Sequence, residues 1–226
     1  MPADASAVVS TAPPPFLPLP FQPPDIEVKR GSDGAVYLSS RTPLAPQAQS
    51  IPHLLDRRAK DHPDRLWLRE RAPGHGPWRG VSYGEGARLT RSLGQALIDR
   101  GLGPHAPLMI LSENSIEHAL MSLAAQRIGA PAAAVSRAYS TMSGDFAKLR
   151  QCVEAIRPRA VFVQARAPFA QALAQAPLEG VTIISVDGAD GATPFAELAA
   201  VQPRKAVDDR MYWLGPPSVG KYLFTS

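Results

Sequence analysis

The apolar and polar positions of the chain follow two different periods, and the change from one to the other predicts its architecture. Residues 25–40 (DIEVKRGSDGAVYLSS) alternate apolar and polar side chains on both sides of a turn that runs from Gly31 to Gly34. A period of two is typical of strands, and a short glycine-containing connection between two such runs is typical of a hairpin. We therefore predict two short antiparallel strands in this region.

Helical spacing of the apolar positions begins at Ser50. Ser50 can cap the amino end of a helix, Pro52 suits the first turn, and His62-Pro63 stops the helix. The expected apolar face consists of Leu54, Leu55 and Ala59. Two later runs, 66–71 and 78–81, predict a strand pair around a turn rich in proline and glycine.

Two more helices carry capping signals at their amino ends. Ser82 and Glu85 have the spacing of a capping box, and the helix that they open is closed by Gly101. Asn114 and Glu117 have the spacing of a second cap. The apolar faces expected for these two helices are Leu89, Leu93, Ala96 and Leu97 in the first, and Ile116, Leu120, Leu123, Ala124 and Ile128 in the second.

Short buried strands and amphipathic helices then alternate to the end of the chain. The expected strands are 107–111, 132–136, 160–163 and 181–186, and the expected helices are one from Ser143, 169–176 and 195–201. Such alternation predicts an α/β fold with a doubly wound, mostly parallel sheet that is covered by helices on both faces. Gly188 to Gly191 lacks the full Gly-x-Gly-x-x-Gly spacing, which disfavours a dinucleotide-binding version of this fold.

Composition refines this picture in three ways. Eight of the 24 prolines lie in residues 1–24, which predicts an extended, flexible leader before the domain of residues 25–226. The net charge of +4 is spread without basic runs, which disfavours nucleic acid as a partner. No apolar stretch approaches the length of a membrane span.

The single cysteine and the histidines limit which disulfide, nucleophilic and metal chemistry the chain can have. Cys152 cannot form an internal disulfide, fits a reducing, cytoplasmic location, and is interpreted as a core residue of a helix rather than a nucleophile. The five histidines have no ligand spacing, so we expect no metal site: they are His53, His62, His75, His105 and His118.

The segment from Gly215 to Ser226 (GPPSVGKYLFTS) carries the candidate site. An apolar run behind a Gly-Pro-Pro turn predicts a strand at Lys221–Phe224, and two small hydroxyl residues, Thr225 and Ser226, follow it. Hydroxyls and backbone N–H groups at the end of a strand can bind phosphate oxygens. From these residues alone, an ordinary edge strand remains the simpler interpretation.

Several segments together resemble one family. Residues 81–86 (VSYGEG), 111–118 (LSENSIEH) and 129–136 (GAPAAAVS) resemble early segments of the AMP-forming acyl-CoA synthetases, which belong to the adenylate-forming enzymes. The likeness covers roughly residues 16–226 and is strongest to the feruloyl-CoA synthase branch of that family. The segments that favour this branch are 25–28 (DIEV), 138–140 (AYS), 145–150 (DFAKLR) and 221–226 (KYLFTS).

The resemblance implies a function for a longer enzyme. It implies that Thr225 and Ser226 begin a phosphate loop of the form Thr-Ser-Gly-Ser-Thr-Gly that binds ATP, so that residues 25–226 are the N-terminal part of an AMP-binding domain truncated at this loop. The parent enzyme would join a hydroxycinnamic acid to CoA through an acyl adenylate, using ATP and Mg²⁺. The chain would then contain no catalytic residue, bind none of these molecules productively, and be inactive without the missing C-terminal part.

One residue departs from the family pattern, and two other functions stay open. Arg137 stands where the family has proline between Ser136 and Ala138. A ligase for fatty or other carboxylic acids would have a similar N-terminal half. A non-catalytic α/β interaction module with a proline-rich arm is the alternative from a different class of protein.

Overall fold

The structure is a computed structural model, and it describes residues 24–72 and 76–224. The chain divides into two compact units, Met1–Gln47 and Ala48–Ser226. The leader expected over residues 1–24 lies outside the described residues except for Pro24, and His75 lies outside them as well.

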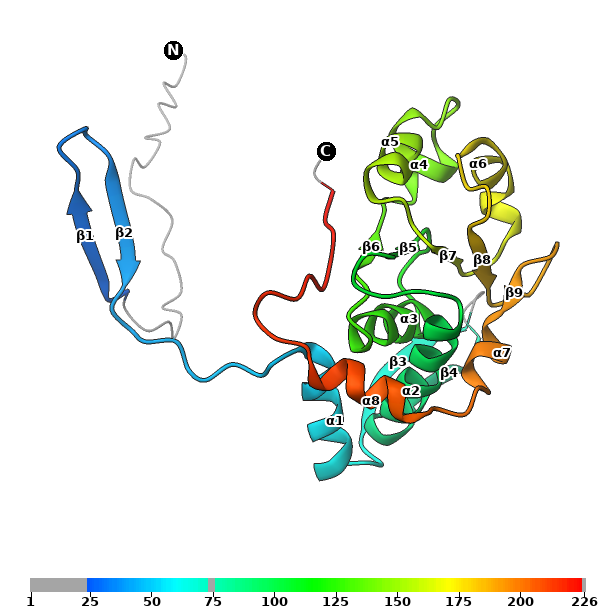
Figure 1. The fold of residues 1–226 in the computed structure, drawn as a ribbon, viewed down its shortest axis with the longest axis horizontal. Helices are drawn as coiled ribbons and strands as arrows, with labels where there is room; N and C mark the ends of the chain where they lie inside the picture. The colour runs from blue at the N-terminus through cyan, green and yellow to red at the C-terminus, as the bar shows by residue number, and fades with distance from the viewer. Residues whose placement is uncertain (1–23, 73–75, 225–226) are drawn as a thin grey trace, which may run out of the picture. The chain divides into compact units, whose positions relative to one another are not determined.

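The described part of the first unit is the hairpin that the alternating pattern predicts (Figure 1). Strands β1 (Ile26–Arg30) and β2 (Val36–Ser40) pair in antiparallel register, with Val28 opposite Leu38. Gly34 has a φ of 84°, which favours glycine in the connecting turn. The hairpin prediction is therefore confirmed.

The second unit opens with helix α1 (Ile51–Asp61) and the antiparallel pair β3 (Leu66–Arg71) and β4 (Trp78–Ser82). Ser50 caps α1 as predicted, and its hydroxyl accepts from the backbone N–H of His53. Leu55 is buried, but Leu54 is exposed because it lies at the edge of the apolar face.

Five parallel strands form the central sheet, in the order β6-β5-β7-β8-β9. They are β5 (Leu108–Ile110), β6 (Ala132–Ala134), β7 (Ala160–Val163), β8 (Thr182–Ser185) and β9 (Thr193–Pro194). The chain passes from β5 to β6 on one side and then to β7 on the other side of β5. This reversal of direction is the defining feature of a doubly wound sheet, as predicted.

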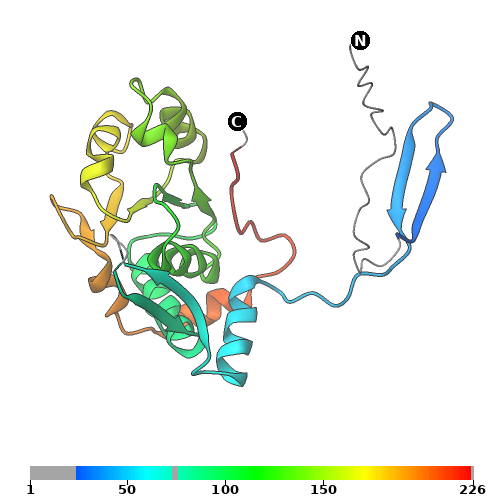
Figure 2. The same ribbon diagram turned by 180° about the vertical axis from the view of Figure 1, so that it is seen from behind.

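Helices cover the two faces of this sheet in separate groups (Figures 1 and 2). The helices of the second unit after α1 are α2 (Tyr83–Asp99), α3 (Ile116–Arg127), α4 (Ala138–Thr141), α5 (Ala147–Ile156), α6 (Ala170–Gln175), α7 (Phe195–Ala199) and α8 (Lys205–Tyr212), with a 3-10 turn η1 (Ala167–Phe169) before α6. Successive strand residues point to opposite faces, so Leu108 and Ile110 pack with α2, α3 and α7, whereas Met109 packs with α5 and α6.

For α2 the serine half of the predicted capping box is confirmed, and for α3 the predicted cap is wrong by one residue. The Ser82 hydroxyl accepts from the N–H of Glu85 at 3.2 Å, as expected for the start of α2. At the start of α3 the cap is Ser115 rather than Asn114: its backbone is extended, and its hydroxyl accepts from the N–H of His118 at 3.0 Å. Asn114 is exposed, and the carboxylate of Glu117 accepts a hydrogen bond from Arg79 instead of taking part in a cap.

The predicted terminal strand at Lys221–Phe224 is also wrong. Only Lys221 pairs, in a single parallel bridge to Ala132 of β6. Within β6, Ala132 is the residue whose N–H and C=O form hydrogen bonds with the segment. Leu223 does not join the sheet and is 78% exposed. None of the helices in the described ranges is both long enough and apolar enough to cross a bilayer.

Candidate functional site

The position of a site in this fold follows from the reversal beside β5. In open α/β sheets ligands bind beyond the carboxyl ends of the strands, at the point where neighbouring connections leave toward opposite faces. Here β5 leads to α3 on one face and β7 leads to α6 on the other. A cavity of about 450 Å³ lies there, enclosed by the β3–β4 pair, the loops after β5, β6 and β7, and η1. We call it the switch-point crevice.

Arg79, which lines the switch-point crevice, takes part in an ion pair that joins β4 to α3. Arg79 forks onto Glu117, with Nη1 at 2.5 Å from Oε1 and Nη2 at 2.7 Å from Oε2, and also contacts the carboxylate of Glu70. Burial acts to raise the pKa of Glu117, but hydrogen bonds from Arg79 and Gln164 outweigh it, so the pKa of this carboxyl is lowered. The hydrogen bond to Glu117 in turn raises the pKa of Arg79. The pair is therefore charged at neutral pH.

Side chains from β7 and β3 complete this network. Gln164, directly after β7, donates to Glu117 Oε2 at 3.0 Å and accepts from the Ser115 hydroxyl at 2.7 Å. Glu70 accepts from the backbone N–H of Ile116 at 2.8 Å, which places a carboxylate of the chain at the amino end of α3. This end of the helix, which would attract an external anion, is thus already occupied by Glu70.

The rim of the crevice is polar on one side and apolar on the other. Arg137, after β6, pairs with Glu113, after β5. Ala165, Pro168 and Phe169 form an apolar wall. The loop that contains Arg137, where the family pattern has proline, therefore faces the crevice.

The site predicted from the sequence was Thr225 and Ser226, and both lie outside the described residues. The described chain approaches them along β6: Ala132 donates to the carbonyl of Gly220 at 3.1 Å and accepts from the N–H of Tyr222 at 3.1 Å. Because the bridge is parallel, the segment runs toward the carboxyl edge of the sheet.

Sequence reasoning missed the switch-point crevice. Its one visible signal was the presence of polar residues directly after predicted strands, at Ser112–Ser115 and Gln164. The network itself joins Arg79 to Glu117 and Glu117 to Gln164, over separations of 38 and 47 residues. Pairing over such distances is a property of the folded chain that local patterns do not contain.

Other candidate groups in the described residues do not form a site. Cys152 is buried in α5, and burial raises the pKa of its thiol, as expected of a core residue. No three carboxylate, imidazole or thiol side chains gather as metal ligands within residues 24–72 and 76–224.

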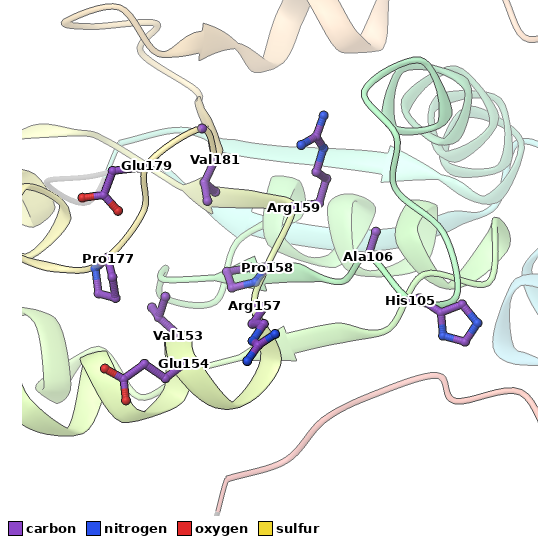
Figure 3. A pocket seen from close by; sticks show the side chains of 11 residues that line it. His105, Ala106, Val153, Glu154, Arg157, Pro158, Arg159, Pro177, Glu179 and Val181 are labelled. Carbon is purple, nitrogen blue, oxygen red and sulfur yellow. The ribbon is translucent and has the colours of Figure 1, made fainter.

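A second cavity, of about 510 Å³, lies at the opposite, amino-terminal edge of the sheet. Figure 3 shows that its charged side chains fan out in different directions instead of meeting at one point: Glu154, Arg157, Arg159 and Glu179. All four are exposed, and Arg159 Nε donates to the carbonyl of Arg100. This cavity is therefore not built around a common ligand.

Comparison of the sequence with protein families gives a match over most of the chain. The family described as AMP-binding enzyme matches residues 55–219, which include the whole central sheet. The chain belongs to the AMP-binding enzyme family. Comparison with curated protein sequences gave no match.

Solved structures share the fold of this AMP-binding enzyme chain. A luciferase-like enzyme of the mealworm Zophobas morio matches with a TM-score of 0.59 and 13% identity, over 85% of this chain and 40% of that chain. A putative long-chain-fatty-acid CoA ligase of Rhodopseudomonas palustris matches with a TM-score of 0.55 and 21% identity, over 68% of this chain and 37% of that chain.

A benzoate CoA ligase of Burkholderia xenovorans matches with a TM-score of 0.53 and 19% identity, over 68% of this chain and 29% of that chain. At these identities the likeness shows the fold alone. The AMP-binding enzyme chain covers between 29% and 40% of the length of these three structures.

Proposed function

We propose that the chain is part of an acid:CoA ligase that activates a hydroxycinnamate-like aromatic acid as an acyl adenylate. In the first step a carboxylate oxygen attacks the α-phosphorus of ATP and pyrophosphate leaves. In the second step the CoA thiol attacks the acyl carbon and AMP leaves. The family match over residues 55–219 carries the adenylate-forming part of the proposal. The choice of an aromatic acid rests on the sequence segments 138–140 and 145–150.

We assign the described residues a structural part in this reaction. The segment after Gly220 runs beside β6, and Thr225 and Ser226 follow it in the sequence as the proposed start of the ATP phosphate loop. The amino end of α3 at the switch point is occupied by Glu70, so this helix end does not serve as a phosphate cradle. Among the described residues, no three carboxylate, imidazole or thiol side chains gather as ligands for Mg²⁺.

The 226-residue chain alone is proposed to be inactive. The full loop Thr-Ser-Gly-Ser-Thr-Gly does not occur in its sequence. Without such glycines the backbone N–H groups cannot approach the phosphates closely. We place the complete enzyme in the cytoplasm, because Cys152 is a free, buried thiol and ATP and CoA are its proposed substrates.

Substrate choice is tested by competition between acids. A longer protein that carries this sequence is incubated with ATP, Mg²⁺, CoA and equal amounts of ferulate and decanoate, and the CoA thioesters are identified by mass spectrometry. Feruloyl-CoA as the main product supports the proposal. Decanoyl-CoA as the main product would favour the fatty-acid ligase, the second candidate, whose fold is shared by the R. palustris enzyme. If neither thioester forms, a ligase for another carboxylic acid or the non-catalytic module becomes the better description.

A further inference from the structure

The hairpin of β1 and β2 has one apolar face and one polar face (Figure 1). Residues that stand directly opposite each other in an antiparallel pair share a face, and so do alternate residues of one strand. Val28 and Leu38 stand opposite each other, so they share a face with Ile26 and Val36. These four apolar side chains are 44–66% exposed.

The opposite face of the hairpin suits contact with water. It carries Glu27, Lys29, Tyr37 and Ser39, and the Nζ of Lys29 lies 3.4 Å from a carboxylate oxygen of Glu27. Charged and hydroxyl side chains stay hydrated, whereas an exposed cluster of apolar side chains is unfavourable in water. A two-stranded hairpin is also barely stable by itself. The apolar face therefore needs a packing partner.

We propose that residues 16–21 (FLPLPF) of the same chain cover this apolar face. They belong to the same unit as the hairpin and lie outside the described residues. All six side chains are apolar, and no charged residue occurs between Asp4 and Asp25. Burial of the segment therefore removes no charge from water, and Pro18 and Pro20 have no N–H that would need a new partner. This packing is independent of the proposed ligase activity.

The spacing of apolar residues in the segment suits this position. In an extended backbone alternate side chains point the same way, so Leu17, Leu19 and Phe21 share one side and the two intervening prolines take the other. Residues before proline favour such extended backbone. Gln22 to Asp25 then leads into β1. Three steps of about 3.1 Å in the polyproline II conformation span about 9 Å, close to the separation of about 10 Å between packed layers.

A second copy of the chain is a weaker candidate for covering this face. Four half-exposed side chains in each copy offer far less than the about 1,200 Å² of total surface that stable interfaces between proteins bury. A segment of the same chain needs less area, because its docking does not cost the translational and rotational freedom of a second molecule. Its prolines also restrict the backbone in advance, which reduces the entropy lost on docking.

Hydrogen exchange of the 226-residue chain tests this packing. Phe21→Ser removes a large apolar side chain from the proposed contact and should accelerate amide exchange in residues 26–40 at least about tenfold. Phe21→Leu is the matched control: it keeps an apolar side chain at the same position and should have a much smaller effect. Val9→Ser changes the leader outside the proposed segment and should have none. Exchange in α2, which belongs to the other unit, should be the same in all of these proteins.

Nuclear Overhauser contacts in the unmodified chain give a direct second measurement. The ring protons of Phe21 should lie close to methyl groups of Val28 or Leu38. The proposal is overturned if no such contact is found, or if Phe21→Ser and the unmodified chain exchange their hairpin amides at the same rate. It is also overturned if protection of the hairpin rises with protein concentration, because a second copy would then be the occupant of the apolar face.

Discussion

Arg79 of β4 and Glu117 of α3 form a forked ion pair, 2.5 Å and 2.7 Å between paired atoms, that fixes the β3–β4 pair against the amino end of α3. Glu117 is buried, so the loss of Arg79 would leave its negative charge buried without a positive partner. The switch-point crevice has its shape because this pair and Gln164 hold three elements together.

Removal of Arg79 should destabilise the second unit more than removal of an exposed arginine. For Arg79→Met we expect a loss of about 2–3 kcal/mol in the free energy of unfolding, below the range for fully buried pairs because the Arg79 side chain is 46% exposed. Arg91→Met breaks the exposed pair with Asp208 and should cost less than about 1 kcal/mol. Urea unfolding measures both, and equal losses would show that the Arg79 pair has no special role.

The same pair makes stability depend on pH in a defined direction. The pKa of Glu117 is lower in the folded chain than its ordinary value of 4.5. Its contribution to stability is therefore fully present above that value and is lost as the pH falls through the lower folded pKa. The stability difference between the unmodified chain and Glu117→Gln should shrink as the pH is lowered from 6 toward 3, about the range in which carboxyl groups titrate. A difference that stays constant or grows in acid would contradict the charged pair.

The assignment of the α3 cap can be tested by two neighbouring substitutions. Ser115→Ala removes the cap and the hydrogen bond to Gln164, and should cost about 1–2 kcal/mol in the free energy of unfolding. Asn114→Ala, at an exposed position, should stay within about 0.5 kcal/mol of the unmodified chain. The reverse order, measured by chemical unfolding, would restore Asn114 as the cap.

Arg127 of α3 is fully buried and forks onto Asp56 of α1. Asp56→Ala leaves a buried cation unpaired and should cost about 3 kcal/mol or more. Arg127→Met removes the cation and leaves Asp56, which is 35% exposed and can be hydrated, so its loss should be smaller. Thermal unfolding of both variants checks this order, and a larger loss for Arg127→Met would mean that packing rather than charge dominates here.

The periodic patterns predicted most of the fold, because helices and strands with one buried face carry that face in their local sequence. The hairpin of residues 26–40 and helix α2 are examples. Helix α8 was not predicted, since only Val207 and Met211 are buried in an otherwise polar segment. Lys221–Phe224 looked like a strand by propensity but finds a single partner residue.

The functional site was less predictable than the fold. Ser115 and Asn114 are both good caps in sequence, and only the backbone geometry separates them. The crevice depends on contacts such as that between Gln164 and Glu117, which form only after the sheet is assembled. The family resemblance supplied the phosphate-loop prediction, whereas the one local signal of the crevice was the polar residues directly after the predicted strands.

The central claim is that this AMP-binding enzyme chain is part of an acid:CoA ligase, and acid-dependent ATP–pyrophosphate exchange tests it most directly. A longer protein that carries this sequence is incubated with ATP, Mg²⁺ and labelled pyrophosphate, with and without ferulate. We predict that label enters ATP only when the acid is present, and that the 226-residue chain alone gives no exchange. Exchange by the short chain would contradict its proposed inactivity, and no exchange by the longer protein with ferulate, benzoate or decanoate would contradict the ligase function.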